Sequence, residues 1–250
     1  MSAPRHVVWF SCGAASAVLA KVVADARPHG QELVVVYCDT SKSEHPDNRR
    51  FMREVKFWID TPITVIRSEK FRTVDEVIAA KSYMSGILGA PCTVEMKKIP
   101  RFAFQRADDI HYFGYTVDER TGRREDFEKN NPELALRWPL VDANITKNEC
   151  FARLRKAGIA LPVMYRLGYP NNNCIGCVKA QSPAYWQKIR RDFPEVFAER
   201  VRQSREYGVR LAKVKEERVF IDELPEEAPM LPLTESVTCG PECASEEPRS

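Results

Sequence analysis

Short apolar runs alternate along this chain with longer segments in which apolar residues recur every three or four positions. The short runs are rich in valine, isoleucine and aromatic residues, which favours β-strands, and the longer spacing is typical of amphipathic helices. We therefore expect strands at 6–10, 33–38, 63–67 and 110–115. We expect helices at 14–26, 46–59, 74–81, 148–157, 184–191 and 195–207. This alternation predicts an α/β fold with a doubly wound, mainly parallel sheet and a helical C-terminal part.

Composition separates a folded body from an acidic tail. The chain has 250 residues, 44% hydrophobic and 29% charged, which is enough to bury a full core. Residues 222–250 hold eight acidic residues, five prolines and one arginine, so we expect one domain at 1–221 and a flexible tail at 222–250. The formal charge of +3 then leaves +10 on the body, because the tail contributes −7. A basic body suits a nucleotide or nucleic acid, and a solvated lysine and arginine surface is the alternative.

Eight cysteines occur, at positions 12, 38, 92, 150, 174, 177, 239 and 243. The N-terminal residues lack the apolar segment of a secretory signal, and no apolar run is long enough to cross a membrane, so we expect a cytoplasmic protein with no membrane association. In a reducing compartment the Cys174-Ile-Gly-Cys177 pair indicates a metal or redox element rather than a disulfide. Cys12, Cys38 and Cys150 lie in apolar or helical contexts and are expected to be small core residues.

Small and polar residues follow the first two predicted strands. The turn from Ser11 through Cys12, Gly13 and Ala14 to Ser16 runs directly into a helix, where backbone N–H groups and serine hydroxyls can bind a phosphate or sulfate. Tight strand-to-helix packing also requires small residues there. The next strand ends in Cys38, Asp39 and Thr40, and the carboxylate of Asp39 can bind a ribose or Mg²⁺, or cap the following helix. Ligands of such sheets bind at the carboxyl ends of the strands.

These segments resemble the phosphoadenylyl-sulfate (PAPS) reductase family, within the adenine nucleotide α-hydrolase-like proteins that carry a pyrophosphate loop. The family loop Ser-Gly-Gly-x-Asp-Ser is similar to 11–16, and its Asp-Thr-Gly is similar to 39–41. Three further segments are similar to family motifs in the same order, at 113–120, 138–150 and 162–177. The resemblance covers about 6–200 and implies a HUP-like, PAPS reductase-like nucleotide-binding domain.

The resemblance also implies which residues contact the ligands. The nucleotide-binding set that it implies comprises Ser11, Cys12, Gly13, Ala14, Ser16, Asp39, Thr40, Lys97, Gly114 and Arg120. The spacing of Cys92, Cys174 and Cys177 is similar to that of the family's [4Fe–4S] site, and Cys239 is the candidate fourth ligand. Structural zinc or uncomplexed thiols are the alternatives, because four thiolates satisfy Zn²⁺ equally well.

In sulfonucleotide reductases a cysteine on a C-terminal tail attacks the sulfonate sulfur, and thioredoxin or another thiol reductant releases sulfite. Cys243, which follows Glu242, is the candidate nucleophile here, and the roles of Cys239 and Cys243 can be exchanged. The resemblance therefore implies an oxidoreductase that uses PAPS or its relative APS.

Two positions depart from the family pattern. Ala15 stands in place of the loop aspartate, and only one cysteine stands at Pro91-Cys92-Thr93 where cluster-bearing reductases have two. The family tail motif is also incomplete, because Ala244 follows Cys243. Two other functions remain open. One is an ATP-dependent sulfur-insertion enzyme that uses Mg²⁺ and acts on DNA or tRNA, and the other is a nucleotide-binding module without catalysis.

Overall fold

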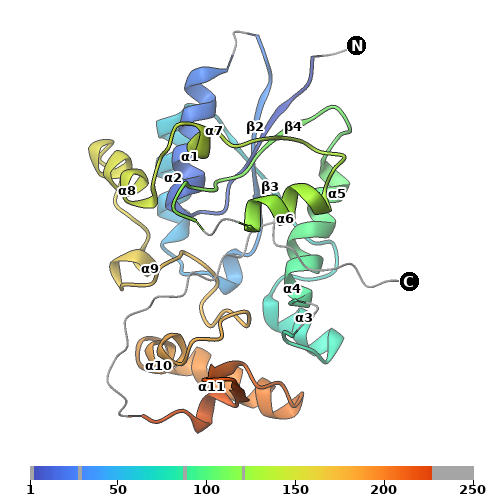
Figure 1. The fold of residues 1–250 in the computed structure, drawn as a ribbon, viewed down its shortest axis with the longest axis vertical. Coiled ribbons are helices and arrows are strands. Elements are labelled where there is room, and N and C mark those ends of the chain that lie inside the picture. Colours follow the sequence, from blue (N-terminus) through green and yellow to red (C-terminus); the bar gives the residue numbers. More distant parts are fainter. Residues whose placement is uncertain (1–2, 28–29, 87–88, 120–121, 227–250) are drawn as a thin grey trace.

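Five parallel strands form the central sheet of the computed structural model, which describes residues 3–27, 30–86, 89–119 and 122–226. The strands are β1 (His6–Trp9), β2 (Leu33–Cys38), β3 (Ile63–Ile66), β4 (Ile110–Tyr112) and β5 (Ala135–Arg137), in the spatial order β3-β2-β1-β4-β5 (Figure 1). Because β1 pairs with both β2 and β4, the order of the sheet reverses direction at β1. In open parallel sheets, ligands bind at such a reversal, outside the carboxyl ends of the strands.

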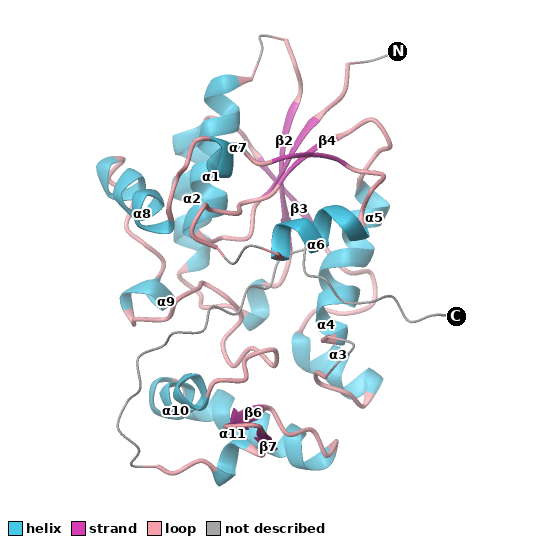
Figure 2. Ribbon diagram, in the orientation of Figure 1, coloured by secondary structure: helices cyan, strands magenta, loops and turns pink. Residues whose placement is uncertain are grey.

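Helices cover both faces of the sheet, as the two-sided apolar character of β1 and β2 requires (Figure 2). On one face, Val8, Phe10 and Val35 pack beneath α1 (Ala14–Ala26), α2 (Asn48–Ile59) and α8 (Lys147–Lys156). The short helix α7 (Pro139–Asp142) contributes to the same layer. In α2 the buried positions Phe51, Val55 and Ile59 are four residues apart and therefore lie on one face.

The opposite face is aromatic. Trp9, Phe113, Phe127 and Trp138 pack there with Val36, beneath α5 (Ile99–Phe104) and α6 (Arg123–Asn130). The two faces follow from strand alternation, because successive side chains of β1 point to opposite sides of the sheet.

A third core lies beyond the carboxyl edge of the sheet and contains Cys92, Cys174 and Cys177. Its elements are α3 (Val74–Lys81), α4 (Pro91–Thr93), the π-helix η2 (Val94–Lys98), α9 (Val163–Arg166), α10 (Pro183–Asp192), α11 (Pro194–Glu206), the antiparallel pair β6 (Ala212–Val214) and β7 (Glu217–Val219), and the 3₁₀ helix η3 (Ile221–Glu223). The 3₁₀ helix η1 (Ser41–Ser43) connects the sheet to it, because Ser43 O accepts from Ile175 N at 2.9 Å.

The predicted α/β class with a parallel sheet and a helical C-terminal part is confirmed. The bounds of α1, β2 and α3 are those expected, whereas the predicted strand 110–115 ends at Tyr112. The pattern gave no sign of β5, β6 or β7, because each has only three residues and includes at least one exposed position. Within the described ranges no helix is long and apolar enough to cross a membrane.

Candidate functional site

The turn after β1 is held by hydrogen bonds between its own serines. The Ser16 hydroxyl accepts from Ser11 N at 3.1 Å and from Ser11 Oγ at 3.2 Å, and donates to Gly13 O at 3.0 Å. Cys12 has a φ of 56°, a left-handed conformation that is uncommon outside glycine. No acidic residue lies in the first turn of α1, and its N-cap residue, Gly13, has no side chain that could cap the helix. The turn therefore presents the positive end of a helix at the carboxyl edge of the sheet.

A distant segment of the chain holds this turn in place. Asn172 Nδ2 donates to Cys12 O at 2.7 Å and to Asn48 Oδ1 at 2.8 Å. The Tyr165 hydroxyl accepts from Ala14 N at 3.3 Å, and burial raises the pKa of Tyr165 to about 12. The left-handed Cys12 and the start of α1 are thus fixed by residues that precede the Cys174–Cys177 pair.

A buried carboxylate, Glu44, joins the end of β2 to the start of α2. Its oxygens accept from Tyr37 Oη at 2.9 Å, Thr40 Oγ1 at 2.5 Å and Asn48 Nδ2 at 2.7 Å. Burial and the Glu44 charge raise the pKa of Tyr37, so its hydroxyl stays a donor. Three donors satisfy a carboxylate that would otherwise be costly to bury. The Asn48 side chain then connects Glu44 to Asn172.

A narrow hollow with room for about one water molecule lies where β1 and β2 end. Its lining residues come from both strand ends and the π-helix: Trp9, Phe10, Ser11, Val36, Tyr37, Cys38, Thr40, Glu44 and Lys97. The Lys97 side chain is buried and brings a positive charge to this hollow. Cys12 is fully buried, and burial together with Glu44 raises the pKa of its thiol, an effect that Lys97 opposes.

Glycine is required at position 114 because the backbone there lies against the backbone of Ser16, at the point where the strand order reverses. A Cβ added to Gly114 would lie 2.9 Å from Ser16 N and 3.0 Å from Ser16 Cα. Backbone atoms at that distance cannot move aside as a flexible side chain would. The chain leaving β4 therefore passes directly against the first turn of α1 only because position 114 has no side chain.

Asp39 lies at the rim of the site rather than inside it. Its Oδ1 accepts from Ser41 N at 3.2 Å and from Ser41 Oγ at 2.6 Å. Its Oδ2 lies 3.7 Å from an Arg67 guanidinium nitrogen. The carboxylate is partly exposed, whereas Thr40 beside it is buried. Asp39 therefore remains accessible to a ligand at the carboxyl edge.

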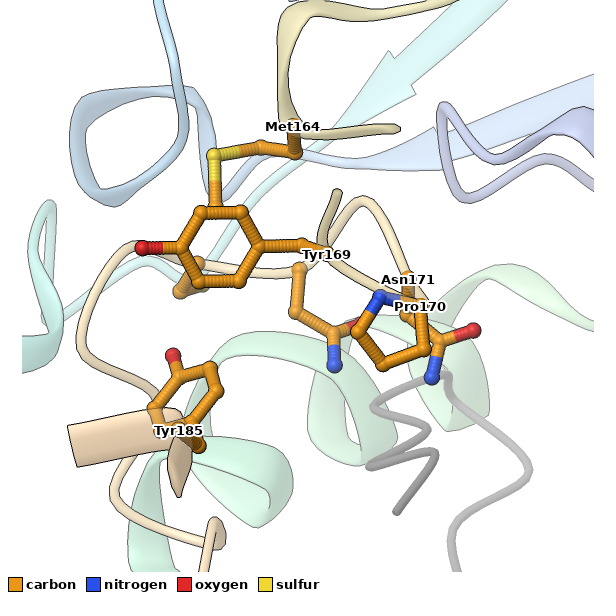
Figure 3. A pocket seen from close by; sticks show the side chains of 7 residues that line it. Met164, Tyr169, Pro170, Asn171 and Tyr185 are labelled. Atoms are coloured by element: carbon orange, nitrogen blue, oxygen red, sulfur yellow. The ribbon is translucent and has the colours of Figure 1, made fainter. Parts of the chain in front are cut away.

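The Cys174–Cys177 turn is also held by defined contacts. Gly176 has a φ of 63°, and Arg200 Nε donates to its carbonyl oxygen at 2.9 Å. The Tyr185 hydroxyl accepts from Cys177 N at 2.8 Å. A narrow hollow with room for about one water molecule adjoins Cys174. Figure 3 shows the Met164 thioether beside the Tyr169 ring and the Tyr185 hydroxyl directed toward that ring.

The structure brings Cys92, Cys174 and Cys177 into one buried core. Within the described part of the chain, however, no three or more histidine, cysteine, aspartate or glutamate side chains are arranged to hold a metal ion. These donors alone therefore do not fit an iron–sulfur cluster or a zinc ion. Cys239, Cys243 and Arg120 lie outside the described residues.

The sequence did not single out four residues that shape this site: Tyr37, Glu44, Asn48 and Asn172. Each is an ordinary polar residue whose partner lies on a different element. The run Asn171-Asn172-Asn173 before Cys174 was a usable signal, because three consecutive amides offer many donors beside a turn. The expected burial of Cys12, Cys38 and Cys150 is borne out, since all three are at most 5% exposed.

No family model matches the chain. A nin region protein of Escherichia phage lambda, ORF290, described as uncharacterized, is 29% identical in an alignment 199 residues long that covers 70% of this chain. The chain spans 66% of that relative, less than two thirds of its length. Among solved structures, phosphoadenylyl-sulfate reductase from Candida auris in complex with phosphate is similar, with a TM-score of 0.45 and 13% identity over 70% of this chain and 82% of that chain.

Proposed function

We propose that this chain binds an adenine nucleotide at the carboxyl edge of its sheet and is a PAPS reductase-like oxidoreductase. One observation supports the binding site above all others. The serine-bearing turn before α1 and the buried Lys97 line the same hollow, and Asp39 lies beside it. Hydroxyl and backbone N–H donors with a buried cation suit a phosphate or sulfate, and a rim carboxylate suits a ribose hydroxyl.

In the proposed complex the chain positions the anionic part of the nucleotide and excludes water from it. Lys97 supplies a positive charge, and the Ser11 and Ser16 hydroxyls turn from each other to the ligand. Cys12 contributes through its left-handed backbone conformation, which orients the turn toward the ligand, rather than through its thiol. Thr40 and Gly114 act indirectly, since Thr40 fixes Glu44 and Gly114 allows the close approach to α1.

The proposed reaction uses a cysteine of the segment 227–250. The Cys243 thiolate attacks the sulfonate sulfur, forming an S–S bond while the S–O bond to the phosphate breaks and the adenosine phosphate leaves. A dithiol such as thioredoxin then attacks the Cys243 sulfur. Sulfite leaves with the electron pair of the S–S bond, which gives a mixed disulfide between Cys243 and the dithiol. The second thiol of the dithiol then displaces the Cys243 thiolate, so oxidation of the dithiol to a disulfide supplies the two electrons. Cys239 is the other candidate for this role.

The described cysteines support a nucleophile from that segment. Cys12 and Cys150 are fully buried, and burial raises the pKa of Cys150 to about 12. A buried thiol with a raised pKa is a poor nucleophile, because the thiolate is the reactive form.

A [4Fe–4S] cluster on Cys92, Cys174, Cys177 and Cys239 remains part of the proposal, although no step of the reaction runs through it. The described donors do not form such a site alone, so the prediction depends on Cys239. Zinc in the same place is the competing possibility. Iron and acid-labile sulfide contents after purification without oxygen decide between them.

The proposed function is tested by assaying two products from one preparation. Sulfite formed from PAPS or APS with a thiol reductant, and lost in Cys243→Ser or Cys239→Ser, is the expected result. Sulfite formation that survives both substitutions together overturns the role of that segment. Pyrophosphate released from ATP and Mg²⁺ without sulfite would instead indicate the ATP-dependent sulfur-insertion enzyme. Nucleotide binding without either product would indicate a non-catalytic module.

A further inference from the structure

A second concave surface is lined by residues from α1, α2 and α8, the helices that cover one face of the sheet. This groove encloses about 920 Å³, open solvent included. Helix α1 contributes Val18, Lys21, Val22 and Asp25, α2 contributes Trp58, and α8 contributes Arg153, Lys156 and Ala157. None of these residues belongs to the site at the carboxyl edge of the sheet.

Two cations of α8, Arg153 and Lys156, line this groove. Among the described residues, neither Arg153 nor Lys156 forms an ion pair, and both are exposed. Lys21 instead pairs with Asp25 at 2.7 Å. The exposed Arg202 on α11 shows the contrast, because it pairs with Glu199 at 2.7 Å and Glu206 at 2.5 Å on its own helix. The groove therefore carries two positive charges beyond the Lys21–Asp25 pair. Glu149 lies one turn before Arg153 on α8, and its pKa is lowered first by hydrogen bonds from Thr146 and further by the Arg153 charge.

An aromatic ring completes the groove. Trp58 is half-buried: it packs against the core shared by α1, α2 and α8, and it also lines the groove. Part of the indole is thus packed against the protein core, and the remaining part is accessible to a ligand in the groove. A positively charged groove with a fixed aromatic ring is the arrangement by which proteins bind single-stranded nucleic acid, with phosphates on the cations and a base stacked on the ring.

We propose that the groove between α1, α2 and α8 binds single-stranded nucleic acid. Phosphates contact Arg153 and Lys156 on α8, and one unpaired base stacks on Trp58 of α2. The strand is single because a base in a duplex is already stacked and cannot reach a ring inside a groove. The surface does not depend on the proposed nucleotide site, and binding is measured without nucleotide.

An anionic membrane is a poorer occupant for this surface. Membrane-bound helices bury an apolar face in the lipid, but the apolar face of α2 is buried against the sheet. The large apolar side chains that are most exposed in the described chain are Phe57, Val65, Ile99, Phe102, Val117, Leu167 and Val214, and none of them lines the groove. The surface is thus defined by positive charge and one aromatic ring, not by apolar side chains that insert into a lipid bilayer.

The test is fluorescence anisotropy with a labelled oligothymidylate of about 12 nucleotides at several salt concentrations. We expect Arg153→Gln and Lys156→Gln each to weaken binding severalfold and to reduce the log–log salt slope by about 0.7, the effect of one lost phosphate contact. The matched control is Arg155→Gln, because Arg155 lies on the same helix with the same charge but does not line the groove. We expect it to leave the slope unchanged.

Trp58→Leu keeps an apolar side chain against the core and removes the stacking surface, so we expect roughly tenfold weaker binding. Loss of part of the indole packing should lower the thermal midpoint by a few degrees, so binding is measured well below it. Equal losses in Arg153→Gln and Arg155→Gln would overturn the proposal, as would no binding to the oligonucleotide at low salt. Tighter binding to phosphatidylserine vesicles than to the oligonucleotide would assign the groove to membranes instead. Because sulfite and pyrophosphate are assayed separately, failure of this proposal is distinguishable from failure of the proposed reaction.

Discussion

The Asn172 side chain donates a hydrogen bond of 2.7 Å to the Cys12 carbonyl oxygen, although 160 residues separate the two positions. The same amide nitrogen donates to Asn48, which in turn donates to the buried Glu44. The turn before α1 is therefore fixed from outside the strand–helix unit that contains it. The segment that fixes it continues directly into the Cys174–Cys177 turn, which connects the two halves of the candidate site.

Asn172→Ala removes both of these hydrogen bonds and leaves Cys12 O and Asn48 Oδ1 without this donor. We expect the free energy of unfolding to fall by about 2–4 kcal/mol, because buried acceptors lose their partner. We also expect weaker nucleotide binding, since Cys12 is no longer held in its left-handed conformation. Urea unfolding and a nucleotide titration measure the two effects. The control is Asn130→Ala, at an exposed position on α6, where both quantities should stay unchanged.

Gly114→Ala places a methyl group against the backbone of Ser16. We expect a loss of about 1–3 kcal/mol, as for other overpacked positions, because the first turn of α1 must shift to make room. Since that turn is part of the candidate site, affinity for the nucleotide should fall with stability. A variant with normal stability and normal affinity would show that the chain leaving β4 can move away from α1 at no cost.

His111 makes the stability of the fold depend on pH. Trp9 Nε1 donates to His111 Nδ1 at 3.1 Å, and burial lowers the pKa of the ring from 6.5 to about 4. Below pH 6.5 the His111 ring binds a proton in the unfolded chain, whereas in the folded chain it binds one only at about pH 4. The free energy of unfolding therefore falls as the pH falls through this window. Each pKa unit corresponds to about 1.36 kcal/mol, so the total loss is on the order of 3 kcal/mol. Unfolding measured between pH 7 and pH 4 should show this decline, and His111→Gln should flatten it.

The buried thiols should resist alkylation in the folded protein. Cys12 and Cys150 are fully buried with raised pKa values, so iodoacetamide at neutral pH should modify them orders of magnitude more slowly than in urea. Mass spectrometry of peptides after a timed reaction gives the rate for each cysteine. Rapid labelling of Cys12 in the native protein would mean that the turn opens, and would make the Cys12 thiol a candidate nucleophile.

Local patterning determined the elements of the sheet and most of its helices. The β-branched run at 33–38 could only be a buried strand, and the small residues at 14–26 form a helix in any α/β context. The turn between Ser11 and Ser16 was visible as well, because its small and polar residues are contiguous in the sequence, although Asn172 and Tyr165 hold it from a distant segment. The short strand Ala135–Arg137 was missed because two of its residues are exposed, which leaves no apolar signal.

The tertiary structure alone decided what surrounds that turn. Lys97 reaches the hollow from a π-helix, Asn172 donates to Cys12 O and Asn48 Oδ1, and Gly114 passes against Ser16 because the sheet reverses direction at β1. Such contacts join elements that are distant in sequence, so no local pattern contains them. The sequence by itself determined which residues are chemically able to form a site at the strand ends. The order of the strands determined which of them meet, because only the carboxyl ends of adjacent parallel strands converge on one edge.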